Sequence, residues 1–278
     1  MRLRARLITL VGISCLSHEV AAQSVGGMLA DDVAHFGSDV AAVWTAPFDA
    51  SSRDWLLAAG AIGAFGVSMF ADRPVAHWAA NNRDSRIIRA LKPMRRGGRA
   101  YSAKFLMPPL VGLYVAGLAA NRQDLRDAAT GCATSWFSQS MPRQVTYRLV
   151  ARQRPDTSPD DPQRWDLPGN GNWHFQSFPA GHFANAVACA TFWSGRYHLG
   201  VGAPVLYVIA AAVGAGRIAD GGHWFSDTVL GGIIGYATGR EVARRSLARV
   251  DPQSSGTGPN GSRSLSRPAP AVVFVIPF

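Results

Sequence analysis

An arginine, a histidine and an aspartate near the end of the chain have types and spacing suited to chemistry on an oxyanion. Arg217, His223 and Asp227 follow one another as Arg-x5-His-x3-Asp. On a helix, His223 and Asp227 would share a face, so the carboxylate could accept the Nδ1 hydrogen and leave Nε2 as a free base or nucleophile. The forked guanidinium of Arg217 could bind a tetrahedral oxyanion beside that nitrogen. The spacing alone is only suggestive.

A second segment, residues 177–182, reads Ser-Phe-Pro-Ala-Gly-His. A proline followed by a nearby glycine favours a tight turn, and the amide hydrogens of such a turn, that of Gly181 among them, can point at an anion. His182 would then supply a second imidazole for general acid–base work near neutral pH.

Another segment, residues 147–155, comes first in the chain and reads Tyr-Arg-Leu-Val-Ala-Arg-Gln-Arg-Pro. It is a basic helical end that Pro155 terminates. Taken singly, its arginines Arg148, Arg152 and Arg154 fit a solvated helix end, where cations stabilise the C-terminal dipole. A lone histidine in apolar surroundings is likewise more often a core residue than a catalyst. Three such segments in one order favour a shared phosphate site.

In this order, the segments resemble the motifs of the type 2 phosphatidic acid phosphatase and vanadium haloperoxidase superfamily. That family carries Lys-x6-Arg-Pro, then Pro-Ser-Gly-His, then Ser-Arg-x5-His-x3-Asp, and the resemblance covers roughly residues 55–245. It implies that His223 attacks phosphorus and forms a phosphohistidine, with Asp227 orienting it. It implies that His182 protonates the leaving alcohol and later activates water. It also implies that the phosphate oxygens are held by Arg154, Arg217 and the Gly181 amide.

Three positions depart from those motifs. Tyr147 stands where the family has lysine, Ala180 where it has serine, and Gly216 where it has the serine before the arginine. Arg148 is the nearest cation to the missing ammonium, but it lies about 100° away around the helix and is an imperfect substitute. Losing one oxyanion donor typically costs about 10²–10³ in rate. The substitutions therefore predict a slow enzyme, an altered substrate preference or a site that only binds.

The leading interpretation is a metal-independent phosphatase, with no cofactor, acting on a phosphomonoester or a lipid (di)phosphate. One alternative is a vanadate-dependent haloperoxidase, in which His223 is the ligand of vanadate. The other is a non-catalytic envelope protein with a degenerate phosphate site. The sequence has no CxxC or His/Cys cluster that would indicate structural zinc.

Composition places the chain between soluble proteins and polytopic membrane proteins. Its 278 residues are 47% hydrophobic and 17% charged, and its formal net charge of +10 comes almost wholly from arginine. It has no recognisable nucleic-acid reader motif, and its basic residues border apolar stretches. We therefore expect a phosphorylated small molecule or lipid as substrate, association with a membrane and no nucleic acid. The sequence identifies no protein partner.

The ends of the chain predict its location. Residues 1–23 are typical of a secretory leader, with a positive start, an apolar core of ten residues and a small-residue cleavage site. This leader indicates a bacterial-type cell envelope, either the inner membrane or the periplasm. Residues 24–50 form a lead-in with one amphipathic helix, and residues 51–249 the phosphatase-like helical domain. Residues 250–278 are expected to be a disordered tail with a short apolar C-terminus.

Charge-free apolar runs predict an all-α fold, a bundle of about six core helices with the active site at one end. Cys132 and Cys189 lie in such runs, where we expect buried free thiols rather than a bridge. The connection 83–104 carries eight basic residues against one acidic residue and is expected at the same end as the site. Several runs are shorter than the ~18 residues of a spanning helix. The runs are 55–71, 105–120, 128–142, 183–195, 199–216 and 228–239.

Overall fold

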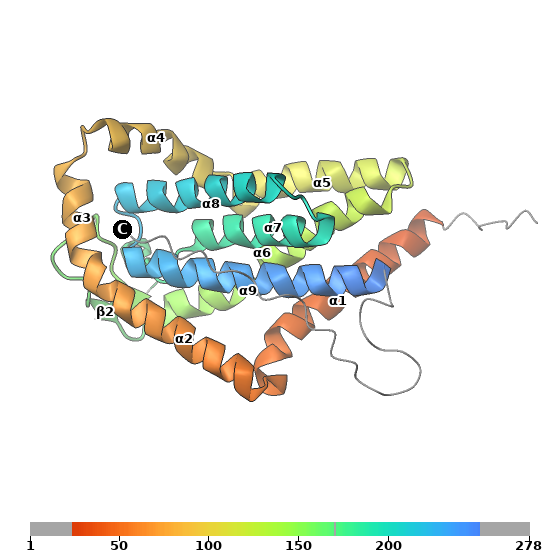
Figure 1. Cartoon of the computed structure of the whole chain (residues 1–278), viewed down its shortest axis with the longest axis horizontal. Coiled ribbons are helices and arrows are strands. Elements are labelled where there is room, and N and C mark those ends of the chain that lie inside the picture. Colours follow the sequence, from red (N-terminus) through yellow and green to blue (C-terminus); the bar gives the residue numbers. More distant parts are fainter. Residues whose placement is uncertain (1–23, 170, 251–278) are drawn as a thin grey trace, which may run out of the picture.

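The computed structural model describes residues 24–169 and 171–250, and these are mostly helical (Figure 1). The predicted all-α class is confirmed, and each of the six apolar runs overlaps a helix. The predicted leader and the tail from residue 251 lie outside the described residues. The helices are α1 (Val25–Thr45), α2 (Ser52–Ser68), α3 (Asp72–Asn81), α4 (Arg86–Arg99), α5 (Ala103–Ala119), α6 (Gln123–Leu149), α7 (Gly181–Tyr197), α8 (Gly202–Ala219) and α9 (Phe225–Val250). The short elements are the 3-10 turns η1 (Ala46–Asp49), η2 (Met69–Ala71) and η3 (Trp173–Phe175), and an antiparallel pair of β1 (Ala151–Arg152) with β2 (Trp165–Asp166).

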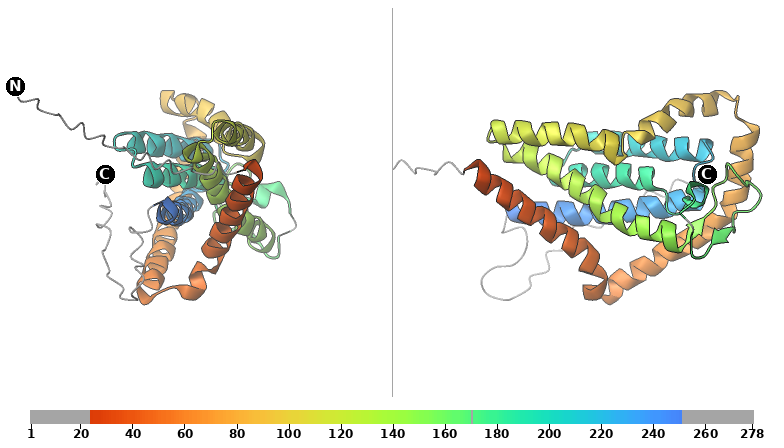
Figure 2. Two further views of the ribbon diagram at one scale, coloured as in Figure 1. Left: turned by 90° about the vertical axis from the view of Figure 1, so that its right-hand side faces the viewer. Right: turned by 180° about the vertical axis from the view of Figure 1, so that it is seen from behind.

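Helix α7 lies at the centre of the bundle and packs against α6, α8 and α9 (Figures 1 and 2). Three glycines of α9, each one turn apart, face α7. A Cβ at Gly231 would lie only 2.8 Å from the carbonyl oxygen of Ala180, and a Cβ at Gly235 or Gly239 would overlap carbonyl oxygens farther along α7. The backbones of α7 and α9 are therefore in direct contact, and side chains larger than hydrogen are excluded at these positions.

Helix α1 lies within residues 24–50, where the sequence predicts a lead-in with one helix. Buried carboxylates hold it to the bundle. Asp32 forms a buried ion pair of 2.8 Å with Arg126 on α6. Asp39, also buried, pairs with two arginines near the end of α9, at 2.6 Å from Arg245 and 2.8 Å from Arg249. Because an unpaired buried charge is costly, these pairs fix α1 against α6 and α9.

Helix α2 runs obliquely beside the bundle and none of its residues is buried (Figure 1). Its capping box, with reciprocal bonds between Ser51 and Asp54, defines its start. Its large apolar side chains are exposed, as are others on α5 and α8. The chain returns to the bundle at Asp72, the first residue of α3, which is fully buried. The exposed apolar residues of α2 include Trp55, Leu56, Leu57, Ile62 and Val67.

The basic connection 83–104 contains a helix, α4, which lies across α8 at the end of the bundle where α3 and the α8–α9 turn also lie (Figure 1). Gly98 approaches α8 closely, since a Cβ there would lie 3.3 Å from Val213 and 3.6 Å from the Cδ of Arg217. The basic segment therefore lies beside the arginine of the third motif, at the end of the bundle that the sequence predicts.

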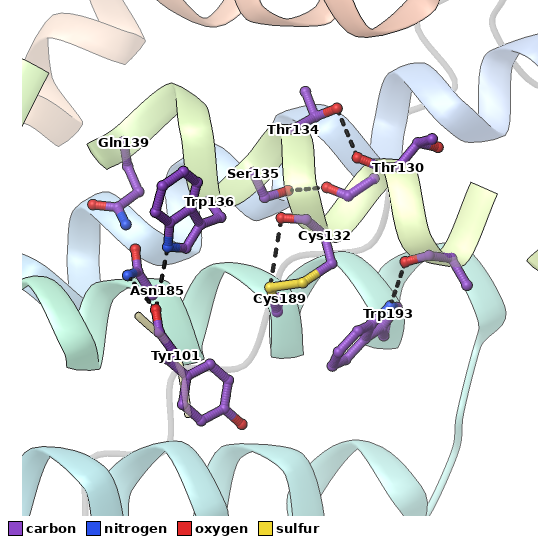
Figure 3. Close-up of a disulfide and its surroundings, with 12 residues drawn as sticks. Tyr101, Thr130, Cys132, Thr134, Ser135, Trp136, Gln139, Asn185, Cys189 and Trp193 are labelled. Atoms are coloured by element: carbon purple, nitrogen blue, oxygen red, sulfur yellow. Dashed lines mark hydrogen bonds between the residues drawn. A yellow bond between two sulfur atoms is a disulfide. The ribbon is translucent and has the colours of Figure 1, made fainter. Parts of the chain in front are cut away.

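Cys132 of α6 and Cys189 of α7 form a disulfide, with their Cα atoms 4.7 Å apart (Figure 3). The prediction of two free thiols was wrong. Both cysteines are fully buried, but they lie on facing turns of two helices, and a separation of 57 residues gives no sign of that proximity. The bridge thus joins α6, which leads into residues 147–155, to α7, which begins within residues 177–182.

Candidate active site

The three motif segments meet at one end of the bundle, in the loops between helices. In chain order, the first segment (residues 147–155) leaves α6 and the second (177–182) ends in the first turn of α7. The third (217–227) runs from the last turn of α8 into α9. Gly221, at φ +68, makes the turn between α8 and α9 that a residue with a Cβ would strain. Backbone bonds join the segments: Ser177 N to Arg152 O (3.1 Å), Asp156 N to Gly221 O (3.0 Å) and Ala180 N to Asp227 O (3.1 Å).

His223 is buried with its ring held in one tautomer. Its Nδ1 lies 2.6 Å from the backbone carbonyl oxygen of Ser177. A carbonyl oxygen only accepts, so Nδ1 carries the hydrogen and Nε2 has the lone pair when the ring is neutral. Burial, reinforced by the positive charges of Arg217 and Arg154, lowers the pKa of His223 well below its ordinary value. His223 therefore presents an unprotonated Nε2 at neutral pH.

Asp227 does not accept the imidazole hydrogen, which corrects the geometry expected from the i, i+4 spacing. His223 precedes the start of α9 at Phe225, so it does not share a helical face with Asp227. Asp227 Oδ2 instead accepts hydrogen bonds from the hydroxyl of Ser177 and from the backbone N–H of Trp224 at 3.2 Å. Ser177 thus links the two residues, since its hydroxyl donates a hydrogen bond to Asp227 and its carbonyl oxygen accepts one from His223.

Behind Asp227 lies a buried group of charges that the sequence interpretation missed. Arg152 is fully buried and forms ion pairs with Asp227 at 2.6 Å and with Asp72 at 2.7 Å. Asp72 also accepts hydrogen bonds from the backbone and the hydroxyl of Ser226, at 2.8 and 2.7 Å. Asp72, the first acidic residue after the apolar run of α2, could have been singled out from the sequence. Its partner could not, since 80 residues separate it from Arg152.

His182 lies in the first turn of α7, beside the Gly181 amide, whose hydrogen has no acceptor within the helix. Burial lowers the pKa of His182 to about 3, and the guanidinium groups of Arg217, Arg143 and Arg154 add to that shift. His182 is therefore neutral at pH 7. A phosphate bound among these guanidinium groups would oppose their field and raise the pKa of His182.

The charges of Arg154 and Arg217 act on both motif histidines. Arg154 donates from Nε to Trp173 O and from Nη2 to Gln176 O, both at 3.0 Å, and stacks on the Trp173 ring at 4.2 Å. Burial and the charge of Arg217 lower the pKa of Arg154 to about 10, so it stays cationic at neutral pH. The guanidinium of Arg217 lies against Gly222, where a Cβ would be 2.6 Å from Nη2.

The substituted positions have other roles. Tyr147 is buried, and its hydroxyl donates to the Pro179 carbonyl oxygen at 3.1 Å. Ala180 is fully buried against Gly231, with its N–H already bonded to Asp227. Arg148, the predicted substitute for the missing lysine, is exposed and is not among the charges that shift the pKa of either motif histidine. The structure therefore does not bring Arg148 into the cluster.

A cavity of about 980 Å³ adjoins the cluster, between α3, α4 and the α8–α9 turn. Its lining mixes apolar and polar surface, with the exposed Arg83 and Arg89 and the carboxylates of Asp156 and Asp220 among its residues, and it includes neither motif histidine. In residues 24–169 and 171–250, no group of three or more His, Cys, Asp or Glu side chains is placed to hold a metal ion. The motif cluster itself offers imidazole and guanidinium groups, which suit an anion.

Comparison with known proteins gives three matches. A family model described as the PAP2 superfamily matches residues 128–250. Lipid A 1-phosphatase of Porphyromonas gingivalis is 37% identical over 67 residues, 23% of this chain and 15% of that protein's length. The transmembrane PAP2 type phosphatidylglycerolphosphate phosphatase from Bacillus subtilis is 18% identical with a TM-score of 0.43, over 80% of this chain and 96% of that one.

The family match covers the segment in which the three motifs and both histidines lie, and the geometry of that segment is the one just described. The PAP2 superfamily model thus matches the part of this chain that carries the motifs, residues 128–250.

Proposed function

We propose that this chain is a phosphatase that hydrolyses a lipid phosphomonoester or diphosphate through a phosphohistidine at His223. The observation that carries the proposal is the 2.6 Å hydrogen bond from His223 Nδ1 to the carbonyl oxygen of Ser177, because it leaves Nε2 unprotonated in a ring on which the charges of two arginines act. The match of residues 128–250 to the PAP2 superfamily model and the likeness to a protein named lipid A 1-phosphatase support the same reaction class.

In the first step, His223 Nε2 attacks phosphorus, a P–N bond forms and the P–O bond to the leaving alcohol breaks. His182 transfers to the departing oxygen the proton that the phosphate monoanion of the substrate brings. Arg154 and Arg217 neutralise the charge on the non-bridging oxygens, which is the main requirement of phosphoryl transfer. Throughout, the hydrogen stays on Nδ1, hydrogen-bonded to the carbonyl oxygen of Ser177.

In the second step, water attacks the phosphohistidine. His182, now neutral, takes a proton from that water, the P–N bond breaks and inorganic phosphate leaves. His223 returns to its neutral form with Nε2 free. The step consumes one water, and the proton that His182 takes from it leaves with the inorganic phosphate, so His182 ends the cycle neutral, as it began.

An apolar leaving group and a membrane location fit the surfaces beside the site. Two helical stretches in the described part of the chain, Ser52–Asn81 and Gly202–Ala219, are long and apolar enough to cross a membrane, and the first has no buried residue in its most apolar window. The cavity between α3 and α4, which alanines of α3 help to line, adjoins the first of them. A lipid substrate would thus reach His223 from a membrane that α2 contacts.

The disulfide between Cys132 and Cys189 supports a location in the cell envelope. Structural disulfides persist outside the reducing cytoplasm, in compartments such as the bacterial periplasm. The proposal therefore places the catalytic end of the protein on the oxidising side of the inner membrane.

The test is phosphate release from long-chain and soluble phosphomonoesters and from a lipid diphosphate, with EDTA present. His223→Ala is the test variant. His198→Asn is the matched control, because His198 is an exposed histidine at the other end of α7 whose left-handed backbone asparagine tolerates. Alkaline quenching of a reaction with ³²P-labelled substrate should retain label on wild type and on His198→Asn, but not on His223→Ala. Equal phosphate release by all three proteins would sink the proposal.

A further inference from the structure

The first motif lacks its lysine, yet a different cation lies beside its position. Arg143 is on α6, one helical turn before Tyr147, so the two side chains share a face. The guanidinium of Arg143 lies over the Tyr147 ring, with Cζ 5.6 Å from the ring centroid. Tyr147 therefore supports a cation that reaches past it toward the second motif.

The absence of a side chain at Gly181 gives this guanidinium its place. A Cβ built on Gly181 would overlap Nη1 of Arg143 and would lie 3.0 Å from its Cδ. Arg143 thus contacts the turn that begins α7, immediately before His182. Its charge acts on His182 together with those of Arg217 and Arg154. With one further arginine at the end of α4, four guanidinium groups thus act electrostatically on one imidazole.

The guanidinium of Arg143 makes few hydrogen bonds to the residues that the structure describes. Nε is buried and has no hydrogen-bond partner in the part of the chain that the structure describes, and Nη2 has only a 3.4 Å contact with Ser140 Oγ. No carboxylate in residues 24–169 or 171–250 forms an ion pair with Arg143. Arg152 differs, because its guanidinium bonds two carboxylates, a hydroxyl and a carbonyl.

A guanidinium that is partly buried without a carboxylate is destabilising unless an anion joins it. The free donors, the contact with Gly181 and the neighbouring arginines all indicate where that anion would bind. We propose that Arg143 is a substrate-binding residue whose guanidinium replaces the missing motif lysine and donates to a non-bridging oxygen of the phosphate. This inference rests on the proposed function, which supplies the phosphate.

The test compares Arg143→Gln with Arg240→Gln, an exposed arginine on α9 far along the chain from the motifs. We expect Arg143→Gln to lower kcat/KM by about 10²–10³, as the loss of one oxyanion donor does, and to weaken binding of inorganic phosphate. Free guanidinium should restore part of the activity of Arg143→Ala. The melting temperature should stay level or rise, because an unpaired cation is removed. A purely structural arginine would give the opposite pattern, with lower stability and no chemical rescue.

Arg148→Gln tests the rival cation. If Arg148 supplied the missing charge, Arg148→Gln would lower kcat/KM and phosphate affinity while Arg143→Gln left both unchanged. That result would overturn the inference. Phosphate binding, measured by calorimetry with inorganic phosphate, separates this inference from the proposed function. Wild type that binds phosphate but releases none from any substrate contradicts only the proposed function. Unchanged phosphate affinity in Arg143→Gln contradicts only the role of Arg143.

Discussion

His223 donates its Nδ1 hydrogen to the backbone carbonyl oxygen of Ser177, at 2.6 Å, and not to a side chain. No substitution of a side chain can remove that acceptor. What a substitution can change is the position of the carbonyl, which the Ser177 hydroxyl fixes through its bond to Asp227. The tautomer of His223, the proposed nucleophile, is thus set by the main chain, and the placement of its ring depends on the Ser177 side chain.

Ser177→Ala should reduce kcat by about tenfold while leaving most of the fold intact. The carbonyl remains, but its tether to Asp227 is lost, and one net hydrogen bond is worth about 1 kcal/mol. Steady-state kinetics and thermal unfolding check the expectation. Ser138→Ala is the matched control, because the Ser138 hydroxyl is buried without a hydrogen-bond partner in the described chain. If Asp227 oriented His223 directly, both alanine variants would have wild-type kcat.

Arg152→Ala should destabilise the protein by about 3–5 kcal/mol, because it leaves Asp72 and Asp227 as uncompensated buried carboxylates. Arg73→Ala should cost less than about 1 kcal/mol, since the ion pair of Arg73 with Asp160 is solvent-exposed. Denaturant unfolding followed by tryptophan fluorescence measures both changes. Similar losses for the two variants would show that Arg152 does not balance those charges.

The pH profile should show that the proton for the leaving alcohol arrives with the substrate. The pKa of His182 is about 3 in the protein alone, so the ring carries no proton at pH 6. A phosphomonoester monoanion does carry one, up to its second ionisation near about pH 6. We therefore expect kcat/KM to fall as pH rises through the second pKa of the substrate. Substrates with lower second pKa values should shift this alkaline limb to lower pH.

A limb that stays fixed across substrates would instead assign the proton to a group of the enzyme. His182→Asn provides the control for the leaving group. It should slow hydrolysis of alkyl phosphates far more than that of p-nitrophenyl phosphate, whose phenolate leaves without protonation.

Replacing both Cys132 and Cys189 by alanine should lower stability by roughly 4 kcal/mol, the entropy estimate for a bridge that closes a loop of this length. Activity at low temperature should be retained, because the disulfide lies between α6 and α7, away from their motif ends. Unfolding with and without reductant measures the effect, and peptide mapping without reduction checks the bridge. Finding both thiols free in protein purified from cells would contradict this prediction and remove one support for the envelope location.

The helices of the bundle were predictable because the long charge-free runs are rich in Ala, Gly, Leu and Val and show little strand-like alternation. The motif histidines were predictable from residue type and spacing. The acceptor for His223 was not, because a backbone carbonyl carries no mark in the sequence. Arg143 was missed because it lies outside the motif, and its proximity to Gly181 depends on how α6 packs against α7. The disulfide was missed for the same reason.

Contact between the backbones of α9 and α7 has a consequence for the reaction itself. Ala180 leads directly into His182, and Gly231 lies one turn beyond Asp227, so the bare contact between them sets the gap between the two catalytic segments. A single methyl group at Gly231 would widen that gap while leaving every reacting side chain unchanged. In the proposed reaction, the distance from the His182 imidazole to the phosphorus thus depends on Gly231, a residue with no proposed role in the chemistry.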